Sequence, residues 1–481
     1  MLMEAGLPAD RLSRTAPAPK TGIVHLGLGA FFRAHGAIYT EEAVAHSGGD
    51  WGIIGVSLQS PTMHDALTPQ GGTYTALELA PEGAKPRHVQ IVTEVLVAQD
   101  NPLAVLEKMA DPAIRIVSLT VTEKGYCHAP ATGALNLAHP DIQHDLGNPL
   151  PRSAPGFLVR ALELRRQRGL APFTVLSCDN LPENGRVVRG VVLALAQQID
   201  PALADWIAQQ GRFPATMVDR IVPATKPEDL ATVATLTGTH DAAPVLHEPF
   251  RQWVIEDDFV SGARPDWALA GAQMVRDVTP FEHMKLRMLN GTHSALAYLG
   301  YLAGHETISD TVADPVFADF FRRLWQDEII PALTPPPGVS LADYATALFG
   351  RYANPAIRHR TWQIAMDGSQ KLPQRILGTL AEAQATGRAC PGLMLAVAAW
   401  MRYVGGIDET GAPIDVRDPL ADRLRALSDG ADTPEGKVQA LLSVSEIFPP
   451  ALAVPLEAPL TSAYLALLDK GARAATHEVF A

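Results

Sequence analysis

Residues 21–39 read TGIVHLGLGAFFRAHGAIY, and this stretch decides the fold of the first half of the chain. Residues 22–26 are expected to form a short buried strand, Gly27-Leu28-Gly29 a tight turn, and the residues from Ala34 onward a helix. In this order, a glycine turn lets backbone amides and a helix N-terminus approach a pyrophosphate. The third glycine of the usual fingerprint is missing, because Phe32 stands in its place. These residues alone leave two alternatives, a dinucleotide site or a tight turn in an α/β fold.

Strands and helices alternate further along the chain. We expect strands over residues 51–58, 114–121 and 173–178, and helices over residues 101–110 and 156–168. This alternation predicts a mostly parallel sheet with ligands at the carboxyl ends of its strands. Two polar segments, Glu123-Lys124-Gly125-Tyr126 and Asp179-Asn180, follow such strands. The strand over residues 51–58 runs into Gln59-Ser60-Pro61 without a carboxylate, so this strand end does not decide between NAD and NADP.

The character of the sequence changes near residue 278. Alanine- and leucine-rich stretches of helical length follow, over residues 285–302, 315–326, 341–349, 372–385, 393–403, 437–444 and 460–475. We therefore expect two domains, a Rossmann-like dinucleotide-binding domain over residues 1–277 and a mainly α-helical substrate and catalytic domain over residues 278–481.

Composition excludes several classes of function. The 481 residues include 39 Lys and Arg against 52 Asp and Glu, a formal net charge of −13, which argues against a nucleic-acid partner. Three cysteines without a CxxC pair, and the absence of HExxH, predict neither a disulfide framework nor a metal site. The N-terminus is not a secretory signal, and the longest strongly apolar run, residues 393–401, is about half of the ~20 residues that a membrane span needs. A cytoplasmic protein without a membrane partner is expected.

The densest polar cluster is FEHMKLRMLNGTH, residues 281–293. At ~100° per residue, with Lys285 at 0°, Glu282 lies at about 60°, His293 at about 80° and Asn290 at about 140°. One helix face could thus present an acid, an amine, an amide and an imidazole, although Lys285 and His293 would lie ~12 Å apart along the axis. The alternative is an ordinary solvated face on which Lys285 and Glu282 form a weak surface pair.

A second polar cluster, RHRTWQIAMDGSQKLPQR, covers residues 358–375. Asp367-Gly368-Ser369 indicates a turn, and Lys371 and Arg375 follow it. Cations gathered on a turn suit an anionic or polyhydroxylated ligand. Cations that cap helix ends would produce the same pattern, so both interpretations stay open.

Several motifs together resemble the mannitol dehydrogenase family, the polyol-specific long-chain dehydrogenases. The motifs are FFRAH at 31–35, SCDN at 177–180, MVDRIVP at 217–223, EPFRQWVIED at 248–257, and Lys285, Asn290 and His293 spaced as KxxxxNxxH. The resemblance runs from about residue 20 to the end of the chain. Two positions depart from the family pattern, because Phe32 replaces a usual histidine and Gly36 a common glutamine.

The resemblance implies roles for individual residues. Lys285 is similar to the family's catalytic base, Asn180 and Asn290 to its oxygen-binding amides, His293 to its positioning histidine, and Glu282 to its proton-moving acid. It also implies that the cofactor is NAD and that no metal takes part. The expected cofactor-binding residues are Gly27, Gly29, Ala30, Phe31 and Arg33. Asp219 and Lys371 are expected in the active site, and Lys124, Arg360 and Lys371 are expected to bind the substrate carboxylate.

Within the family, residues 121–127 and 358–375 are most similar to the branch that interconverts D-fructuronate and D-mannonate. The expected reaction is hydride transfer between NAD and a small sugar acid. A lysine must lose its proton to act as the base, and burial disfavours its charged form. The alternatives are a mannitol, arabinitol or other polyol dehydrogenase, and a non-catalytic NAD-binding protein. Oligomeric state stays open, with a monomer as one option.

Overall fold

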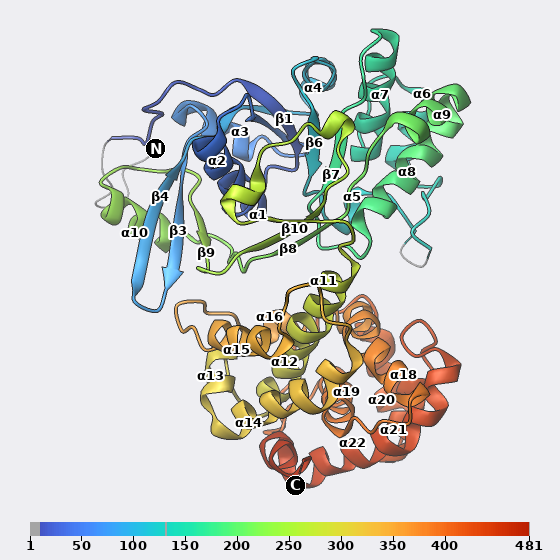
Figure 1. The fold of residues 1–481 in the computed structure, drawn as a ribbon. Coiled ribbons are helices and arrows are strands. Elements are labelled where there is room, and N and C mark those ends of the chain that lie inside the picture. Colours follow the sequence, from blue (N-terminus) through green and yellow to red (C-terminus); the bar gives the residue numbers. More distant parts are fainter. Residues whose placement is uncertain (1–9, 130–131, 481) are drawn as a thin grey trace. The chain divides into compact units, whose positions relative to one another are not determined.

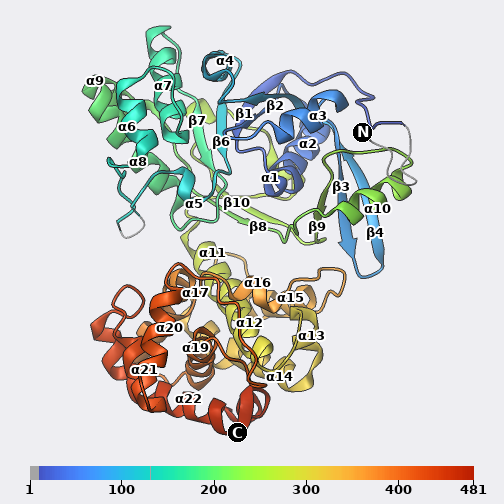
Figure 2. The same ribbon diagram turned by 180° about the vertical axis from the view of Figure 1, so that it is seen from behind.

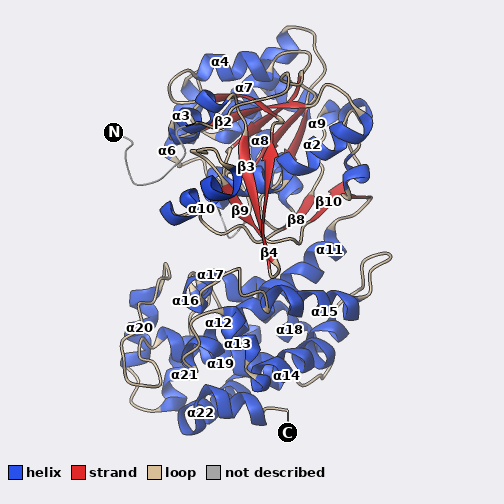
Figure 3. Ribbon diagram, turned by 90° about the vertical axis from the view of Figure 1, so that its left-hand side faces the viewer, coloured by secondary structure: helices blue, strands red, loops and turns tan. Residues whose placement is uncertain are grey.

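The computed structural model describes residues 10–129 and 132–480. The chain divides into two compact units, unit 1 over Met1–Thr279 and unit 2 over Pro280–Ala481 (Figure 1). Within the described residues, the named strands belong to unit 1, whereas unit 2 consists of helices and loops (Figure 3). Unit 1 is therefore α/β and unit 2 helical, as the sequence predicts.

Unit 1 is built on a five-stranded parallel sheet with the order β5-β2-β1-β6-β7. Figure 2 labels four of these strands, β2, β1, β6 and β7. Its strands are β1 Thr21–Leu26, β2 Gly52–Ser57, β5 Val92–Val97, β6 Ile116–Leu119 and β7 Thr174–Ser177. In this register Val24 of β1 lies opposite Ile54 of β2 and Val117 of β6. The strand order reverses at β1, and a reversal of this kind creates a ligand crevice at the carboxyl ends of the strands.

Apolar side chains cover both faces of this sheet, because successive residues of a strand point to opposite faces. Val24, Leu26 and Val117 pack into one buried cluster together with residues of α4, α7 and α8. Ile23 and Ile116 pack into a second cluster together with residues of α2, β3 and β10. A parallel sheet buried on both faces is the arrangement that near-continuous apolar strands predict.

Two three-stranded sheets complete unit 1, and the sequence did not predict them. One has the order β11-β10-β8 and the other β4-β3-β9. Their strands are β3 Tyr74–Ala80, β4 Gly83–Val89, β8 Thr216–Asp219, β9 Val245–His247, β10 Gln252–Glu256 and β11 Gln273–Val275. Each sheet joins a parallel pair to an antiparallel pair.

Side-chain caps begin several helices of unit 1. Asn101 accepts a hydrogen bond from the Ala104 amide at α4, and Ser153 accepts one from the Gly156 amide at α7. The α-helices are α1 Ala30–Ala34, α2 Gly36–Ser47, α3 Thr62–Leu67, α4 Pro102–Met109, α5 Thr122–Gly125, α6 Pro140–Gly147, α7 Ala154–Gln167, α8 Asn184–Ile199, α9 Pro201–Gln210 and α10 Pro227–Thr237. Single 3₁₀ turns are η1 Thr68–Gln70, η2 Val260–Gly262 and η3 Trp267–Ala270.

Unit 2 contains helices of three kinds. Its α-helices are α11 Thr279–Met284, which starts at the boundary, α12 Thr292–Leu302, α13 Ile308–Ala313, α14 Pro315–Arg323, α15 Leu341–Tyr352, α16 Thr361–Ala365, α17 Gly368–Leu372, α18 Gly378–Ala385, α19 Pro391–Val404, α20 Ala421–Asp429, α21 Pro434–Leu442 and α22 Pro450–Glu478. Three segments are π-helical: η4 Lys285–Gly291, η5 Leu324–Ile329 and η7 Pro373–Leu377. One 3₁₀ turn, η6, covers Ile330–Ala332.

The core of unit 2 forms around α12 and α19, which pack against each other and against α22. Both helices are buried over most of their length, which explains their almost wholly apolar sequence. The carboxylate of Glu328, 1% exposed, accepts hydrogen bonds from the amides of Gly392 and Leu393 at the start of α19, at 2.7 and 2.8 Å. Burial raises the pKa of Glu328 to about 7.

The C-terminal helix α22 differs from the other helices in length and composition. Among the described residues it is the one helix long and apolar enough to cross a membrane by those measures, and 28% of its most apolar window is buried. Pro455 and Pro459 lie inside it, and Gly471 interrupts it with φ +78°. It packs on α12, α14, α19 and α21.

Candidate active site

The glycine turn after β1 requires glycine at one position and leaves open space at the other. Gly27 has φ +89°, and a Cβ there would lie 2.1 Å from the carbonyl oxygen of Thr120. Gly29 is exposed, and the nearest heavy atom to a Cβ placed there is the Gly27 oxygen at 3.7 Å. The turn therefore packs tightly on the end of β6 and presents its second glycine to the outside.

His25 stabilises this turn through hydrogen bonds of its buried imidazole. Its Nδ1 lies 2.8 Å from the Ser118 hydroxyl, and its Nε2 lies 2.9 Å from the Thr120 hydroxyl and 3.2 Å from the Gly27 oxygen. Burial lowers the pKa of His25 to about 3, so the ring is neutral. The imidazole thus joins β1 to β6 beside the switch in strand order.

The two departures from the family motif compensate each other. The Phe32 ring stacks on His25 with centroids 3.3 Å apart, and a Cβ at Gly36 would lie 2.7 Å from the Phe32 ring. The Phe32 ring thus occupies the space that a side chain at position 36 would need. A side chain at position 36 would require the Phe32 ring to move.

The other predicted cofactor residues lie on or beside α1. Ala30 is half-buried at the first position of this helix, and the half-buried Phe31 stacks on His35 at 5.0 Å. Arg33 is 4% exposed, with its guanidinium over the Tyr74 ring and hydrogen-bonded to the Ala243 oxygen. These contacts tie the Arg33 side chain to the core of unit 1, and its cofactor role stays a prediction.

Asp179 links the ends of β6 and β7. Its carboxylate accepts hydrogen bonds from the amides of Val121 and Thr122, at 3.0 and 2.9 Å, and from the Tyr126 hydroxyl at 2.7 Å. Burial raises the pKa of Asp179, and these hydrogen bonds oppose that rise. Asp179 therefore holds the turn that bears Lys124 against the segment that bears Asn180. No motif predicts this role, although the residue directly precedes Asn180.

Lys124 and Asn180 are both exposed at these two neighbouring strand ends. The backbone is strained close to each, with φ +63° at Thr122 and +49° at Glu183. A β-branched residue in the left-handed region is unusual, and such strain gathers at functional sites. Asp219, 4% exposed, ends β8, where it lies opposite Gln252 of β10.

The end of β2 carries no acidic residue. Gln59 and Ser60 follow the strand and are exposed, and the Gln59 side chain accepts a hydrogen bond from Gln99 at 3.1 Å. The nearest acid along the chain, Asp65, lies in α3 and pairs with His64. The structure therefore leaves the preference between NAD and NADP open at this position, as the sequence did.

In unit 2, the predicted catalytic residues share one continuous helical stretch. Glu282 lies in α11, Lys285 and Asn290 lie in η4, and His293 lies in α12. Lys285 and His293 are each 8% exposed, while Glu282 and Asn290 are half-buried. The alternative of a solvated face is therefore wrong for Lys285. The α-helical wheel is also wrong here, because a π-helix pairs residue i with i+5 and turns by a smaller angle per residue.

His293 lies in a buried, positively charged environment. Its ring stacks on Tyr352 at 5.3 Å and meets the edge of His359 at 4.8 Å. Burial is the main reason that the pKa of His293 lies well below its usual value, and the nearby side chains of His359, Arg375, Arg351 and Lys371 lower it further. Burial also lowers the pKa of His359, to about 4, so the cations of this group are two arginines and a lysine.

The cations of the 358–375 segment separate into two sets. Arg358 and Arg360 are exposed and form ion pairs with Glu306, at 3.7 and 3.5 Å. Lys371 lies four residues after Asp367, which has φ +57°. The Lys371 amine donates a hydrogen bond to the Met366 oxygen at 2.5 Å, and the Arg375 guanidinium donates one to the Ser294 hydroxyl at 3.1 Å. Arg375 and Lys371, the second set, are among the charges acting on His293.

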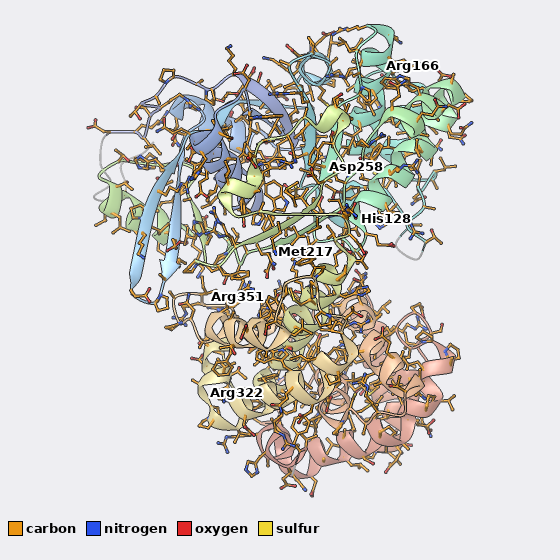
Figure 4. The ribbon with its side chains drawn as sticks, viewed as in Figure 1. His128, Arg166, Met217, Asp258, Arg322 and Arg351 are labelled. Atoms are coloured by element: carbon orange, nitrogen blue, oxygen red, sulfur yellow. The ribbon has the colours of Figure 1, made fainter. Side chains whose placement is uncertain are left out.

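Arg351 and His359 were not predicted as site residues. Arg351, 8% exposed, lies in α15 and is labelled in Figure 4 together with Arg322 of α14. It stands outside every motif that the sequence revealed, and only the packing of α15 brings it near His293. His359 lies inside the RHR motif, which could have identified it. Among the described residues, no group of three or more His, Cys, Asp or Glu could hold a metal ion.

Comparison with known proteins identifies the family of both units. A family model described as the mannitol dehydrogenase Rossmann domain matches residues 21–269, and one described as the mannitol dehydrogenase C-terminal domain matches residues 277–466. The chain is 52% identical to an uncharacterized oxidoreductase of Escherichia coli K12 over 89% of this chain and 87% of the relative. It is 48% identical to the D-mannonate oxidoreductase of the same organism over 98% of each chain.

A solved structure shows the same fold over the whole length. It is the Pseudomonas fluorescens mannitol 2-dehydrogenase in ternary complex with NAD and D-mannitol, 38% identical, with a TM-score of 0.86 over 98% of this chain and 97% of that chain. Fold, motifs and similarity agree along both units. The chain belongs to the mannitol dehydrogenase family of oxidoreductases.

Proposed function

We propose that this protein is an NAD-dependent secondary-alcohol dehydrogenase that interconverts D-fructuronate and D-mannonate. The observation that carries the proposal is the group of cations near His293, of which Arg351 is buried while Lys371 and Arg375 are half-buried. A neutral polyol gains little from such cations, whereas a carboxylate forms charge-assisted hydrogen bonds with them. Similarity to D-mannonate oxidoreductase over almost the whole chain points the same way.

The glycine turn fits a dinucleotide. Gly29 is exposed, and a Cβ added there would have no heavy atom closer than 3.7 Å, so the backbone at this point is open to a bound diphosphate. The residues proposed to hold NAD are Gly27, Gly29, Ala30, Phe31 and Arg33, and the solved relative bound to NAD supports this choice of cofactor. When bound, the nicotinamide supplies the hydride that the carbonyl carbon takes up.

The chain's own residues handle the oxygen and its proton. In reduction, the Lys285 ammonium gives a proton to the carbonyl oxygen as the carbon–hydrogen bond forms, and in oxidation the amine takes that proton back. Asn180 and Asn290 donate N–H groups to this oxygen without adding charge. The neutral His293 positions the substrate, and Glu282 passes the proton onward. Asp219 belongs to the same proposed site.

Lys371 is the proposed principal contact of the substrate carboxylate, together with Lys124 and Arg360. Arg351 and Arg375 add positive charge on the side of His293. The proposed partner is therefore a small sugar acid or ketose. We further propose that the enzyme acts in the cytoplasm, without a metal, a nucleic acid or a membrane.

The second candidate is a mannitol 2-dehydrogenase or another ketose dehydrogenase. It is favoured by the 38% identity to the mannitol 2-dehydrogenase over almost the full chain. In that case the exposed ion pairs of Arg358 and Arg360 with Glu306 would be surface features.

One panel of assays separates the candidates. The purified chain is offered fructuronate, tagaturonate, fructose and xylulose, each with NADH and with NADPH, and absorbance at the nicotinamide band is followed. We expect kcat/KM for fructuronate with NADH to exceed that for fructose by at least tenfold. Equal use of fructose would defeat the uronate assignment, preferred use of tagaturonate would move it to another uronate, and preference for NADPH would overturn the cofactor.

A further inference from the structure

The three π-helical segments of the described chain are gathered in one place in unit 2. η4, which bears Lys285 and Asn290, packs against both η5 and η7. π-helical turns are rare and occur mostly as single turns at functional sites. η4 thus contacts two other widened segments, and its hydrogen bonds show which side chains hold its backbone.

Two side chains donate hydrogen bonds to the backbone of η4 from outside that helix. The Trp325 indole of η5 donates to the Met288 oxygen at 3.1 Å, and the Tyr352 hydroxyl of α15 donates to the Leu289 oxygen at 2.8 Å. Both donors are buried, with 2% and 3% exposure. Buried carbonyls need such partners, so these bonds favour the widened turn over a regular one.

The Leu289 carbonyl, which accepts the Tyr352 hydrogen bond, directly precedes Asn290 in the backbone. It belongs to the planar peptide unit that joins Leu289 to Asn290. A hydrogen bond to its oxygen therefore sets the tilt of the peptide from which the Asn290 side chain projects. Tyr352 thus fixes the backbone nitrogen and Cα of Asn290, the atoms from which the Asn290 side chain projects.

The same tyrosine also supports His293. Its ring stacks on the imidazole with centroids 5.3 Å apart and an interplanar angle of 30°. Trp325 stacks in turn on Tyr352, with ring centroids 6.2 Å apart and an interplanar angle of 18°. Tyr352 thus contacts the backbone before Asn290 with its hydroxyl and the face of His293 with its ring.

The third π segment, η7, packs against η4 next to Asn290. A Cβ at Gly291 would lie 2.7 Å from the Arg375 carbonyl oxygen, so the two backbones touch where Gly291 follows Asn290. Arg375 also donates a hydrogen bond to Ser294, the neighbour of His293. Asn290 is therefore held between a fixed peptide on one side and a backbone contact on the other.

We propose that Tyr352 is the positioning residue of this site, which aligns Asn290 and His293 with Lys285 by fixing the Leu289–Asn290 peptide and the imidazole plane. Only the expected effect of Tyr352 on catalysis rests on the proposed function. Its effect on the η4 backbone is independent of substrate and cofactor.

The test is Tyr352→Phe, which keeps the ring and removes only the hydroxyl. We expect kcat to fall about tenfold while KM changes less than twofold, the effect on rate of about one lost hydrogen bond. We also expect the pH profile of kcat and the isotope effect with deuterated NADH to change. In the ligand-free protein, amide hydrogen exchange should accelerate in residues 286–293 and stay unchanged elsewhere in unit 2.

The matched control is Tyr403→Phe. The Tyr403 hydroxyl is buried in the same unit and has no hydrogen-bond partner within the described residues. Its removal should leave kcat, the pH profile and exchange in residues 286–293 as in the parent protein. A Tyr352→Phe protein that behaves like this control would overturn the proposal.

The remaining outcomes are also decisive. Faster exchange across all of unit 2, with kcat per folded molecule unchanged, would make Tyr352 a merely structural residue and overturn its positioning role. If the parent protein reduces none of the panel substrates, the proposed function fails. In that case, acceleration confined to residues 286–293 would still support the backbone part of the inference, and its absence would overturn that part separately.

Discussion

The two units position their candidate residues by different means. In unit 1, Lys124 and Asn180 follow adjacent parallel strands, and the register of Leu119 with Ser177 brings the two strand ends together. In unit 2, Lys285, Asn290 and His293 lie along one helix, and their directions depend on how far that helix is widened between Lys285 and Gly291. A sheet therefore fixes site residues through backbone pairing, whereas this helix fixes them through contacts with side chains distant in sequence.

The largest effect is expected from removing the amine in unit 2. Lys285→Ala should lower kcat by about 10²–10⁴-fold, the usual contribution of a general acid–base group, while NADH binding measured by fluorescence stays nearly intact. Lys285→Met keeps most of the volume of this buried side chain and should be equally inactive. Near-normal turnover in Lys285→Met would remove the amine from its proposed role.

The glycine turn gives the next largest effect and tests unit 1. Gly27→Ala should lower the free energy of unfolding by about 3–4 kcal/mol, because the methyl group meets the Thr120 oxygen in a left-handed backbone. Gly29→Ala should keep the stability, since its surroundings are open, and should weaken NADH binding instead. Urea unfolding and NADH titration of both variants measure these effects, and equal destabilisation by the two would contradict the geometry.

Most of unit 1 could be predicted from its sequence because the relevant signals are local. Residues 21–29 show strand and turn directly, and parallel topology then places Glu123–Tyr126 and Asp179-Asn180 at one edge. The two small sheets could not be predicted in this way. Their strands have few residues, and partners such as Asp219 and Gln252 lie far apart in the chain.

In unit 2, the helices and the Lys285…His293 motif could be predicted, but not the direction of each side chain. Residues 285–291 look like an ordinary amphipathic helix, since nothing local distinguishes an i+5 from an i+4 ladder. The widening depends on donors in η5 and α15, Trp325 and Tyr352, which the motif does not contain. Arg351 was missed for the same reason.

A third effect concerns the stability of unit 2. Burial raises the pKa of Glu328 to about 7, so the folded state holds a proton that the unfolded chain has lost between about pH 5 and 7. The contribution of Glu328 to stability should therefore fall as pH rises through this window, by about 3 kcal/mol, while His293 and His359, whose pKa values burial lowers, contribute in the opposite direction. Glu328→Gln should remove this contribution, so the difference in free energy of unfolding between parent and variant, from urea unfolding, should change by about 3 kcal/mol between pH 5 and pH 8. The exposed Glu446→Gln should leave it in place.

The smallest expected effect is on KM for fructuronate, and it shows which unit binds the substrate carboxylate. Lys371→Met, in unit 2, should raise KM for fructuronate about tenfold, equivalent to about 1.4 kcal/mol, whereas Lys124→Met, in unit 1, should raise it about threefold. KM for fructose is the internal control and should move less than twofold in both. A larger loss in Lys124→Met would transfer the main contact to unit 1.

The fit of the Phe32 ring over Gly36 limits the order in which this loop can change in evolution. A side chain introduced at position 36 first would collide with the ring, while a smaller residue introduced at position 32 first would leave a void over His25. The two positions are therefore expected to be epistatic, with each single substitution harmful and the paired exchange tolerated. Ancestral or designed versions of the loop are therefore expected to change positions 32 and 36 together.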